Sequence, residues 1–208
     1  MLRGLLISVF TLLFTVNFVF AGKDPAAVKT IENLKAAFEG ESTASAKYAA
    51  YAKKAREEGY PRVALLFEAA SKSEKIHANN HKAALGELGE KSGQVTPKFE
   101  VKSTKENLQD AINGETYEVT TMYPDFIKSA DNDNVNIAKI SMTYAYLTEK
   151  KHKEMYKNAL EKLNSGKEQS LSSTYAVCST CGNTYDAPAP NRCGISMTPK
   201  ERFISLKL

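Results

Sequence analysis

Two copies of one short motif, Glu-x-x-His, constrain the fold of this chain more than any other feature. The first copy is Glu74 with His77, and the second, 75 positions later, is Glu149 with His152. In a helix this i, i+3 spacing places both side chains on one face, so each pair can hold a metal ion. The chain has three histidines, and two of them stand at equivalent places of this repeat. The pattern predicts helices that present metal ligands to one another.

Other short segments repeat at nearly the same distance. Residues 32–34 and 106–108 both read Glu-Asn-Leu, and Gly40-Glu41 matches Gly114-Glu115, each at an offset of 74. Two similar halves predict a pseudo-two-fold axis. Two lone glutamates plus two Glu-x-x-His motifs are the ligand set of di-iron and di-manganese four-helix bundles, with Glu41 and Glu115 as the lone members. We therefore expect an all-α, ferritin-like four-helix bundle over residues 22–166.

Breaks in the apolar periodicity place four long helices at about 27–58, 62–88, 104–130 and 135–164. The first two are separated by Gly59-Tyr60-Pro61, and Pro61 suits a helix start. Ser103 or Thr104 can cap the third helix, and Pro124 should kink it. Residues 89–101 form a long crossover, as in ferritin-like folds, and residues 131–134 form a turn.

The N-terminal segment, 1–21, differs from the rest of the chain in composition. Arg3 is followed by an apolar run from Leu5 to Phe20, and Ala21 is a small residue suited to cleavage. This predicts a signal peptide at 1–21, and hence an exported or periplasmic protein with no membrane contact after cleavage. An uncleaved N-terminal anchor is the alternative. The formal net charge is +4 with lysines and glutamates interspersed, which argues against nucleic-acid binding.

A set of carboxylates and imidazoles is expected to line the bundle interior. Its members are Glu41, Glu74, His77, Glu115, Glu118, Glu149 and His152. Unpaired buried carboxylates are very costly, and two divalent ions would supply their counter-charge. The alternative is that a Glu-x-x-His motif on a Lys- and Glu-rich helix lies on its solvated face. This would be an ordinary explanation of one copy of the motif, but a poorer explanation of two copies in register. His81 has no histidine counterpart in the other half and is expected at the surface or behind the ligands.

The C-terminal part of the chain has a different character. Residues 167–174 are polar and serine-rich, which predicts a linker, and the periodicity disappears over residues 175–208. All three cysteines lie there, at Cys178, Cys181 and Cys193. A segment of about thirty residues buries too little apolar surface to fold unaided, so a small metal-knuckle domain is predicted.

Together these residues resemble the rubrerythrin family, in which a ferritin-like di-iron bundle precedes a rubredoxin-like domain. The resemblance covers nearly the whole chain after residue 21. It rests on Gly40-Glu41-Ser42 with Tyr48, on residues 74–77, on 114–118 with Met122-Tyr123-Pro124, on 149–152, and on the knuckle Cys178-Ser179-Thr180-Cys181-Gly182.

The resemblance implies a pair of iron ions in the bundle and a role for each ligand. Glu74 and Glu149 would bridge the two irons, and Glu41 and Glu115 would be terminal ligands. His152 would be a fixed nitrogen ligand.

The resemblance also implies which residues take part in catalysis. Glu118 and His77 would exchange on one iron as its redox state changes. Tyr48 and Tyr123 would hydrogen-bond the ligating carboxylates. Packing of these two tyrosines as core aromatics is the alternative.

The function implied by the resemblance is that of a peroxidase acting in oxidative-stress defence. The reduced di-iron site would reduce hydrogen peroxide to water, and an unidentified electron donor would reduce the iron again through the cysteine domain, in a homodimer. Carboxylates suit this role because they stabilise both oxidation states of iron and can shift between bridging and terminal modes. Two alternatives stay open: a non-catalytic iron-binding or ferroxidase-type ferritin relative, and a periplasmic metal-sensing or interaction protein. The presence of both Glu118 and His77 favours the peroxidase.

The second cysteine knuckle departs from the family pattern. Ser196 stands where a fourth cysteine is expected, and Met197 where the family has glycine. A serine hydroxyl is a poorer ligand than a thiolate, and methionine fits poorly in a turn that needs a positive φ. Three interpretations follow: an iron or zinc site of Cys178, Cys181 and Cys193 completed by Ser196 or water, a disulfide between Cys178 and Cys181, or an empty vestige.

Overall fold

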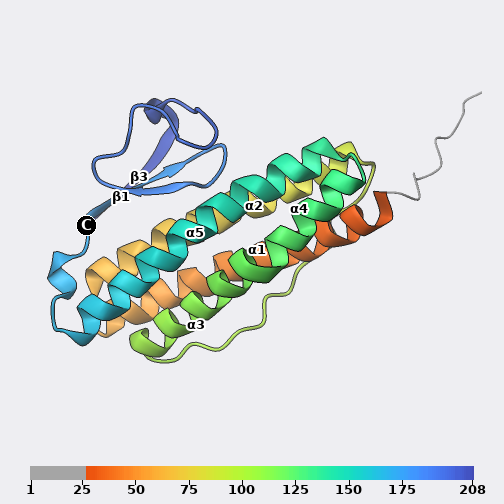
Figure 1. The fold of residues 1–208 in the computed structure, drawn as a ribbon. Helices are drawn as coiled ribbons and strands as arrows, with labels where there is room; N and C mark the ends of the chain where they lie inside the picture. The colour runs from red at the N-terminus through yellow and green to blue at the C-terminus, as the bar shows by residue number, and fades with distance from the viewer. Residues whose placement is uncertain (1–26) are drawn as a thin grey trace, which may run out of the picture.

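The computed structural model describes residues 27–208, so the predicted signal peptide at 1–21 lies outside the described residues. Long helices run side by side as an elongated bundle, and a small sheet lies along one side of it (Figure 1). The predicted helical bundle followed by a small cysteine domain is confirmed. Within residues 27–208, no helix combines the length and the apolar composition that crossing a membrane requires.

Helices α1 (Val28–Glu57) and α2 (Pro61–Glu87) form an antiparallel pair joined by a tight turn. Gly59 has a φ of +82°, a left-handed conformation that glycine adopts without steric strain. Pro61 occupies the first turn of α2, where its missing N–H would have no helical partner in any case. The sequence therefore fixes both sides of this turn.

A long crossover returns the chain along the bundle to the start of α3 (Thr104–Tyr117), as Figure 1 shows. A capping box begins this helix. The Ser103 hydroxyl accepts a hydrogen bond from the Glu106 N–H, and the Glu106 carboxylate accepts one from the Ser103 N–H. Of the two caps predicted, the structure selects Ser103.

The third helical stretch is not a single α-helix kinked at Pro124, as the sequence suggested, but consists of three pieces. After α3 comes a π-helical segment, Glu118–Met122, and then α4 (Tyr123–Asn132). The Tyr123 N–H donates to the carbonyl of Glu118, five residues earlier, so the turn holds one residue more than an α-helical turn. Pro124 falls in the first turn of α4, where its missing N–H is tolerated.

The extra residue of the π-helical segment is visible in the sequence repeat. Glu115 lies 74 positions after Glu41, whereas Tyr123 lies 75 positions after Tyr48. The offset changes across Glu118–Met122, so this segment is where the second half carries one residue more than the first. Such π-bulges often occur at functional sites, and Glu118 is the first residue of this one.

Helix α5 (Asn136–Asn164) follows directly after a short turn. The predicted turn at 131–134 is shorter than expected, because α4 extends to Asn132 and only two residues, Asp133 and Asn134, are in the turn. Asn134 has a φ of +55°, a conformation that asparagine tolerates better than most residues.

The apolar core of the bundle is divided into two clusters. One lies toward the turn between α1 and α2 and includes Phe67, Leu108 and Tyr156. The other lies toward the opposite end and includes Leu34 and Met142. Along every helix, the predicted metal ligands fall between the residues of the two clusters, so a polar layer crosses the bundle at its middle.

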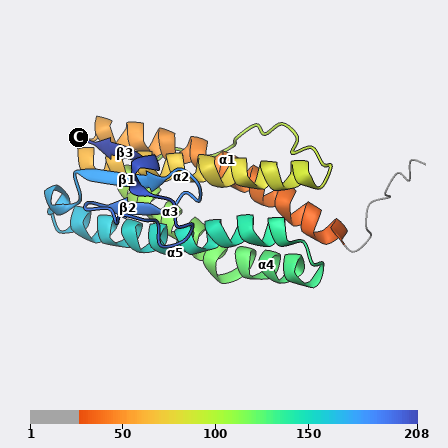
Figure 2. The same ribbon diagram turned by 90° about the horizontal axis from the view of Figure 1, so that it is seen from above.

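The C-terminal domain is an antiparallel sheet with the strand order β2-β1-β3, formed by β1 (Thr174–Cys178), β2 (Thr184–Asp186) and β3 (Phe203–Lys207). Seen from above, it lies over α2 and α5 (Figure 2). Tyr175 and Val177 are buried in the same apolar cluster as the bundle residues. The small domain therefore shares part of the bundle's core, and its three cysteines form a second, smaller cluster with Tyr185 and Phe203.

The predicted linker, residues 167–174, lies against the bundle. Glu168 begins a short 3-10 turn and is buried. Its carboxylate accepts hydrogen bonds from the N–H groups of Arg62 at 2.7 Å and Val63 at 3.3 Å. These are orphan donors of the first turn of α2, so the segment after the bundle caps a helix within it.

Candidate metal centre

The middle of the bundle brings together six of the predicted ligands in two groups. The atoms within 4.8 Å of one another belong to Glu41, Glu74, His77 and Glu149 in one group and to Glu74, Glu115, Glu149 and His152 in the other. Glu74 and Glu149 belong to both groups, which is the placement that two bridging carboxylates require. Each half of the repeat thus contributes one histidine and one lone glutamate.

Several acceptors in this layer have no hydrogen-bond partner. These are both oxygens of Glu74 and one oxygen each of Glu41, Glu115 and Glu149. His77 Nδ1 lies among them, 2.7 Å from Glu149 Oε1 and 2.9 Å from Glu74 Oε2. An unsatisfied buried acceptor costs about 1–3 kcal/mol, and more when it is charged. Acceptors that converge in this way fit a pair of divalent cations between them.

Burial determines the protonation of the lone glutamates when no metal is bound. It raises the pKa of Glu41 to about 8. Burial, reinforced by the neighbouring carboxylates, also raises the pKa values of Glu115 and Glu118 well above the usual range. These three groups therefore hold protons near neutral pH unless a metal displaces them.

Glu149 behaves differently because it lies between the two histidines. Burial alone would raise its pKa, but the positive charges of His77 and His152 outweigh burial and lower it to about 2. Burial alone would likewise lower the pKa of each histidine, and the surrounding glutamates raise it instead. In the metal-free bundle, imidazolium cations partly supply the positive charge that metal ions would otherwise bring.

Two buried tyrosines brace the lone glutamates. Tyr48 donates to Glu115 Oε1 at 2.7 Å, and Tyr123 donates to Glu41 Oε1. The tyrosines are 75 positions apart, so each one holds the glutamate of the other half of the repeat. In both glutamates Oε2 is left without a hydrogen bond. The tyrosines thus fix one carboxylate oxygen and leave the other for a metal.

His81 is fully buried, so of its two expected places the surface is wrong. Its Nε2 lies 3.1 Å from the hydroxyl of Tyr123, and its Nδ1 lies 2.8 Å from Ser141 Oγ. Burial lowers its pKa to about 3, so the ring is neutral. Because Tyr123 donates its own proton to Glu41, the neutral His81 ring donates to Tyr123 and supports this bond from behind.

Glu118 lies next to the two ligand groups without belonging to either. It is half-buried, whereas Glu41 and Glu115 are fully buried. Its pKa responds to both of these carboxylates, so it faces the same layer. His77, its expected exchange partner, lies inside the first group. The proposed exchange of the two ligands stays a prediction.

The cysteine domain contacts the outer side of both ligand histidines. His77 Nε2 lies 3.1 Å from the carbonyl oxygen of Cys181, and His152 Nε2 lies 2.9 Å from Thr184 Oγ1. The Thr184 hydroxyl is itself a donor to the Gly182 carbonyl, so it accepts from His152. Both rings therefore keep a proton on Nε2, and Nδ1, which faces the metal layer, is the nitrogen that a metal would bind in place of a proton.

Gly182 is required where the knuckle meets α2. Its φ is +77°, and a Cβ at this position would lie 2.7 Å from Ser73 Oγ and closer still to the His77 ring. The Ser73 hydroxyl donates to the Gly182 carbonyl at 2.7 Å. A larger residue would push the knuckle away from the histidines.

The three cysteines of the small domain lie together, buried and free of disulfides. Cys181 Sγ and Cys193 Sγ are 3.4 Å apart, and Ser196 Oγ is 3.3 Å from Cys178 Sγ. A hydrogen bond from Cys181, followed by one from Ser196, lowers the pKa of Cys178 to about 4 despite its burial. A thiolate beside two further cysteine sulfurs and a hydroxyl is the donor set of a three-cysteine metal site, the first of the three interpretations.

Met197 adopts the left-handed conformation that the turn needs, with a φ of +59°. The turn is therefore unchanged, and the poor fit of methionine appears as backbone strain at Met197. A non-glycine residue in this region costs about 1–2 kcal/mol. Its N–H still donates to the Cys193 carbonyl, so the second knuckle keeps its shape.

Some functional residues could not be found by sequence reasoning. Thr184 orients His152, and Ser73 and Gly182 hold the knuckle against His77. These contacts join segments that are distant in the chain, and no spacing rule predicts them. One feature of the sequence did point to the role of His81. This residue lies seven positions after Glu74, two turns along the same helix face.

Comparisons with known proteins agree with this arrangement. The sequence model of the family described as Rubrerythrin matches residues 32–160. Nigerythrin of Nitratidesulfovibrio vulgaris is 36% identical over 191 residues, which cover 90% of this chain and 92% of the relative. Rubrerythrin-2 of Clostridium acetobutylicum is 32% identical over 175 residues, covering 84% and 95%. The structure of fully reduced, all-ferrous nigerythrin superposes with a TM-score of 0.77 at 33% identity, over 96% of this chain and 100% of that one.

Ferrous loading of the bundle should release protons, because metal must displace them from Glu41, Glu115 and Glu118. The variant C178S/C181S/C193S isolates this site. It should bind about two ferrous ions per chain, with an affinity that rises from about pH 6 to about pH 8.5 as the proton on Glu41 is lost. Calorimetry in buffers of different ionisation enthalpy measures the protons released.

The matched variants are Glu41→Gln, which should release about one proton fewer, and Glu154→Gln at an exposed position of α5, which should change nothing. Binding of fewer than about one ion per chain would contradict the two-ion site.

Proposed function

The chain belongs to the rubrerythrin family, and from this premise we propose that it is an exported di-iron peroxidase that reduces hydrogen peroxide to water. The observation that carries the proposal is the pair of ligand groups sharing Glu74 and Glu149, with Glu118 beside them. Cleaving the O–O bond of peroxide to two waters takes two electrons and two protons. Two adjacent ferrous ions, when bound, supply both electrons together.

The protein's own residues account for the other requirements. Tyr48 and Tyr123 hold Glu115 and Glu41 through one oxygen each, which keeps these terminal carboxylates in place. Glu118 is the one carboxylate residue of the site that is not fully buried, although burial raises the pKa of its carboxyl, and it lies in a π-helical turn. It is therefore the group best placed to move. This mobility distinguishes a catalytic site from a closed structural one.

Electrons for the next turnover would come through the cysteine domain from an unidentified donor. The backbone carbonyl of Cys181 is hydrogen-bonded to His77, and the side chain of the same residue is one of the three sulfurs of the small site. A metal held there by Cys178, Cys181 and Cys193 would be one hydrogen bond from the bundle ligands. The homodimer expected from the family stays a prediction.

The second candidate is a non-catalytic iron-binding or ferroxidase-type protein. The observation in its favour is Ser196, because an oxygen ligand in the small site would impair electron supply. Peroxide consumption by the reduced, purified protein separates the two candidates. A peroxidase consumes about one peroxide per di-iron site in a single turnover, whereas an iron-binding protein is oxidised mainly by dioxygen.

Export is part of the proposal, on the basis of the apolar run at 5–20 and the small Ala21. The mature protein recovered from the exported fraction should begin at Gly22, as mass spectrometry of the intact chain would show. Recovery of the whole chain from the cytoplasmic fraction would refute export without affecting the metal site.

Replacement of Glu118 or His77 by Ala should slow peroxide reduction by about tenfold or more, equal to about 1.4 kcal/mol in the barrier. Because these are the exchangeable ligands, two irons should remain bound in each variant. Stopped-flow kinetics and metal analysis of the same samples check both points. Glu154→Ala, on the exposed face of α5, is the control. Loss of both irons on either change would mean that the residue is a fixed ligand.

The double variant Ser196→Cys/Met197→Gly should acquire the red ferric tetrathiolate chromophore that the wild type lacks. The fourth thiolate would stand where Ser196 Oγ now lies, 3.3 Å from Cys178 Sγ, and glycine would remove the strain at a φ of +59°. The visible absorbance of the ferric tetrathiolate and the rate of donor-dependent peroxide turnover should both increase. The iron content of the bundle should not change. A full tetrathiolate spectrum in the wild type would show that Ser196 is not the fourth position.

A further inference from the structure

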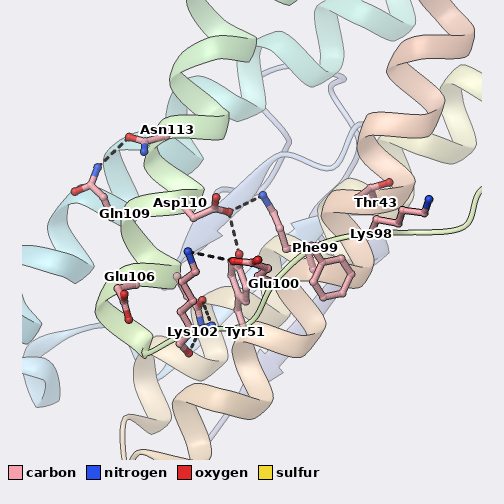
Figure 3. A pocket seen from close by; sticks show the side chains of 12 residues that line it. Thr43, Tyr51, Lys98, Phe99, Glu100, Lys102, Glu106, Gln109, Asp110 and Asn113 are labelled. Carbon is pink, nitrogen blue, oxygen red and sulfur yellow. Dashed lines mark hydrogen bonds and ion pairs between the residues drawn. The ribbon is translucent and has the colours of Figure 1, made fainter.

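Two pockets of the bundle differ in what their polar side chains contact. One, of about 540 Å³, lies between α1, the crossover and α3 (Figure 3). Within it the Tyr51 hydroxyl and Lys47 Nζ both donate to Asp110 Oδ2, at 2.9 Å and 2.8 Å. These three side chains satisfy one another, and their hydrogen bonds do not extend to the metal ligands. This pocket therefore gives no sign of a connection with the metal centre.

The other pocket is a groove of about 430 Å³ between the C-terminal part of α2 and the N-terminal part of α5. Ala84, Ile137 and Ile140 give it an apolar wall, and Ser141 lines it as well. Ser141 is not an ordinary surface serine, because only 5% of the residue is exposed and its Oγ lies 2.8 Å from His81 Nδ1. The groove is therefore in hydrogen-bond contact with a residue behind the metal ligands.

From Ser141 a row of hydrogen bonds leads to the metal layer, and every proton in it has a determined place. Tyr123 donates its only hydroxyl proton to Glu41 Oε1. His81 Nε2, 3.1 Å from the same hydroxyl, must therefore be the donor in that contact. The buried ring is neutral, so Nδ1 carries no proton and accepts a bond from Ser141. We call Ser141, His81 and Tyr123 the donor row, because each member donates toward Glu41.

Loss of the hydroxyl at position 141 would upset this order in either of two ways. If the His81 proton stayed on Nε2, the buried Nδ1 acceptor would lose the partner that it has in the structure, which is unfavourable. If the proton moved to Nδ1, Nε2 would become an acceptor, and Tyr123 could donate to it instead of to Glu41. The cost of the first arrangement favours the second, and the second leaves Glu41 Oε1 without its donor.

The repeat provides an internal comparison at the offset of 75. Tyr156 stands at the position equivalent to His81, and Leu66 at the position equivalent to Ser141. Leu66 has no donor to offer, and the buried Tyr156 hydroxyl has no hydrogen-bond partner among residues 27–208. Both residues belong to an apolar cluster, so apolar packing suffices at this level of the other half. The Ser141–His81 pair therefore has another task, on the side of Glu41.

We propose that Ser141 is a positioning residue of the metal centre, which selects the tautomer of His81 and thereby keeps Glu41 oriented for metal binding. Acting through Tyr123, the donor row holds Glu41 Oε1 and leaves Oε2, which has no hydrogen bond, for the metal. The metal pair follows from the family, so this role does not depend on the substrate that the metal centre reduces.

The exchange of ligands under the proposed function explains why the donor row serves Glu41. Glu41 belongs to the same ligand group as His77, which is expected to leave the metal as its redox state changes. A site that gives up one ligand depends more on the orientation of those that stay. This explanation rests on the proposed function, whereas the positioning role itself does not.

The test compares variants at position 141 that differ in the hydroxyl. Ser141→Ala and Ser141→Val remove the donor, whereas Ser141→Thr keeps it, and threonine and valine have nearly the same shape. The groove leaves room for the added methyl group. Thr143→Val removes a hydroxyl of the same helix that is not bonded to His81, and is the control.

The His81 tautomer is read from proton–nitrogen correlation spectra of the mature protein, labelled with ¹⁵N-histidine and loaded with zinc as a diamagnetic substitute for iron. Wild type, Ser141→Thr and Thr143→Val should show His81 protonated on Nε2. Ser141→Ala and Ser141→Val should move the proton wholly or in part to Nδ1. A wild-type ring protonated on Nδ1, or a tautomer unchanged in both variants without the donor, would refute the proposal.

The ferrous affinity of the bundle is measured by competition with a chelator in the variant C178S/C181S/C193S, where only this site is titrated. Ser141→Ala and Ser141→Val should each lower it by about threefold to tenfold, less than the loss for a direct partner of a ligand, and Ser141→Thr should restore it. Wild-type affinity in both variants without the donor would refute the role even if the tautomer changed. Neither measurement involves peroxide, so failure of the peroxidase function would not affect this inference, and failure of the inference would not affect that function.

Discussion

The need to neutralise five carboxylates inside a helical bundle governs the rest of this structure. Ionised carboxylates cannot stay buried without counter-charge, and two divalent ions cancel four of the five negative charges. The site therefore forms a continuous polar layer, and the apolar core is divided into two clusters on either side of it. Without metal, raised pKa values on Glu41, Glu115 and Glu118 and protonated histidines take over the same task.

Positioning of the two ligand histidines ties the cysteine domain to this layer. Each imidazole gives its Nε2 proton to the small domain, at the Cys181 carbonyl and at Thr184 Oγ1, and so keeps Nδ1 for the metal. The two domains therefore constrain one another: movement of the knuckle would free the rings to turn. Gly182 allows the close approach, and the cap that Glu168 places on α2 holds the connecting segment in position.

The sequence was sufficient to predict the four-helix bundle and to name the residues that meet at its centre, because helical spacing and the repeat are local patterns. It was insufficient for the third helix, where Pro124 suggested a kink and the structure has a π-helical segment. The change of offset from 74 to 75 within the repeat was the available signal. The two offsets place the insertion between Glu115 and Tyr123, but a count of residues does not say whether it forms a bulge within one helix or a break between two. Contacts between domains, such as that of Gly182 with His77, left no local pattern at all.

The extra residue in the third helix also explains why two similar halves make an asymmetric site. Glu118 has Ala44 at the equivalent position of the first half, so only one side of the layer has a carboxylate beyond the shared set. The hydrogen bonds of a π-helical turn are less regular than those of an α-helix, and Glu118 is the first residue of this turn. A ligand that is to move must sit where the backbone is least constrained, whereas Glu41 in the other half is held by Tyr123, whose hydroxyl is in turn hydrogen-bonded to His81. One half therefore holds Glu41 firmly, and the single inserted residue places Glu118 in the segment where the proposed exchange of ligands would need backbone freedom.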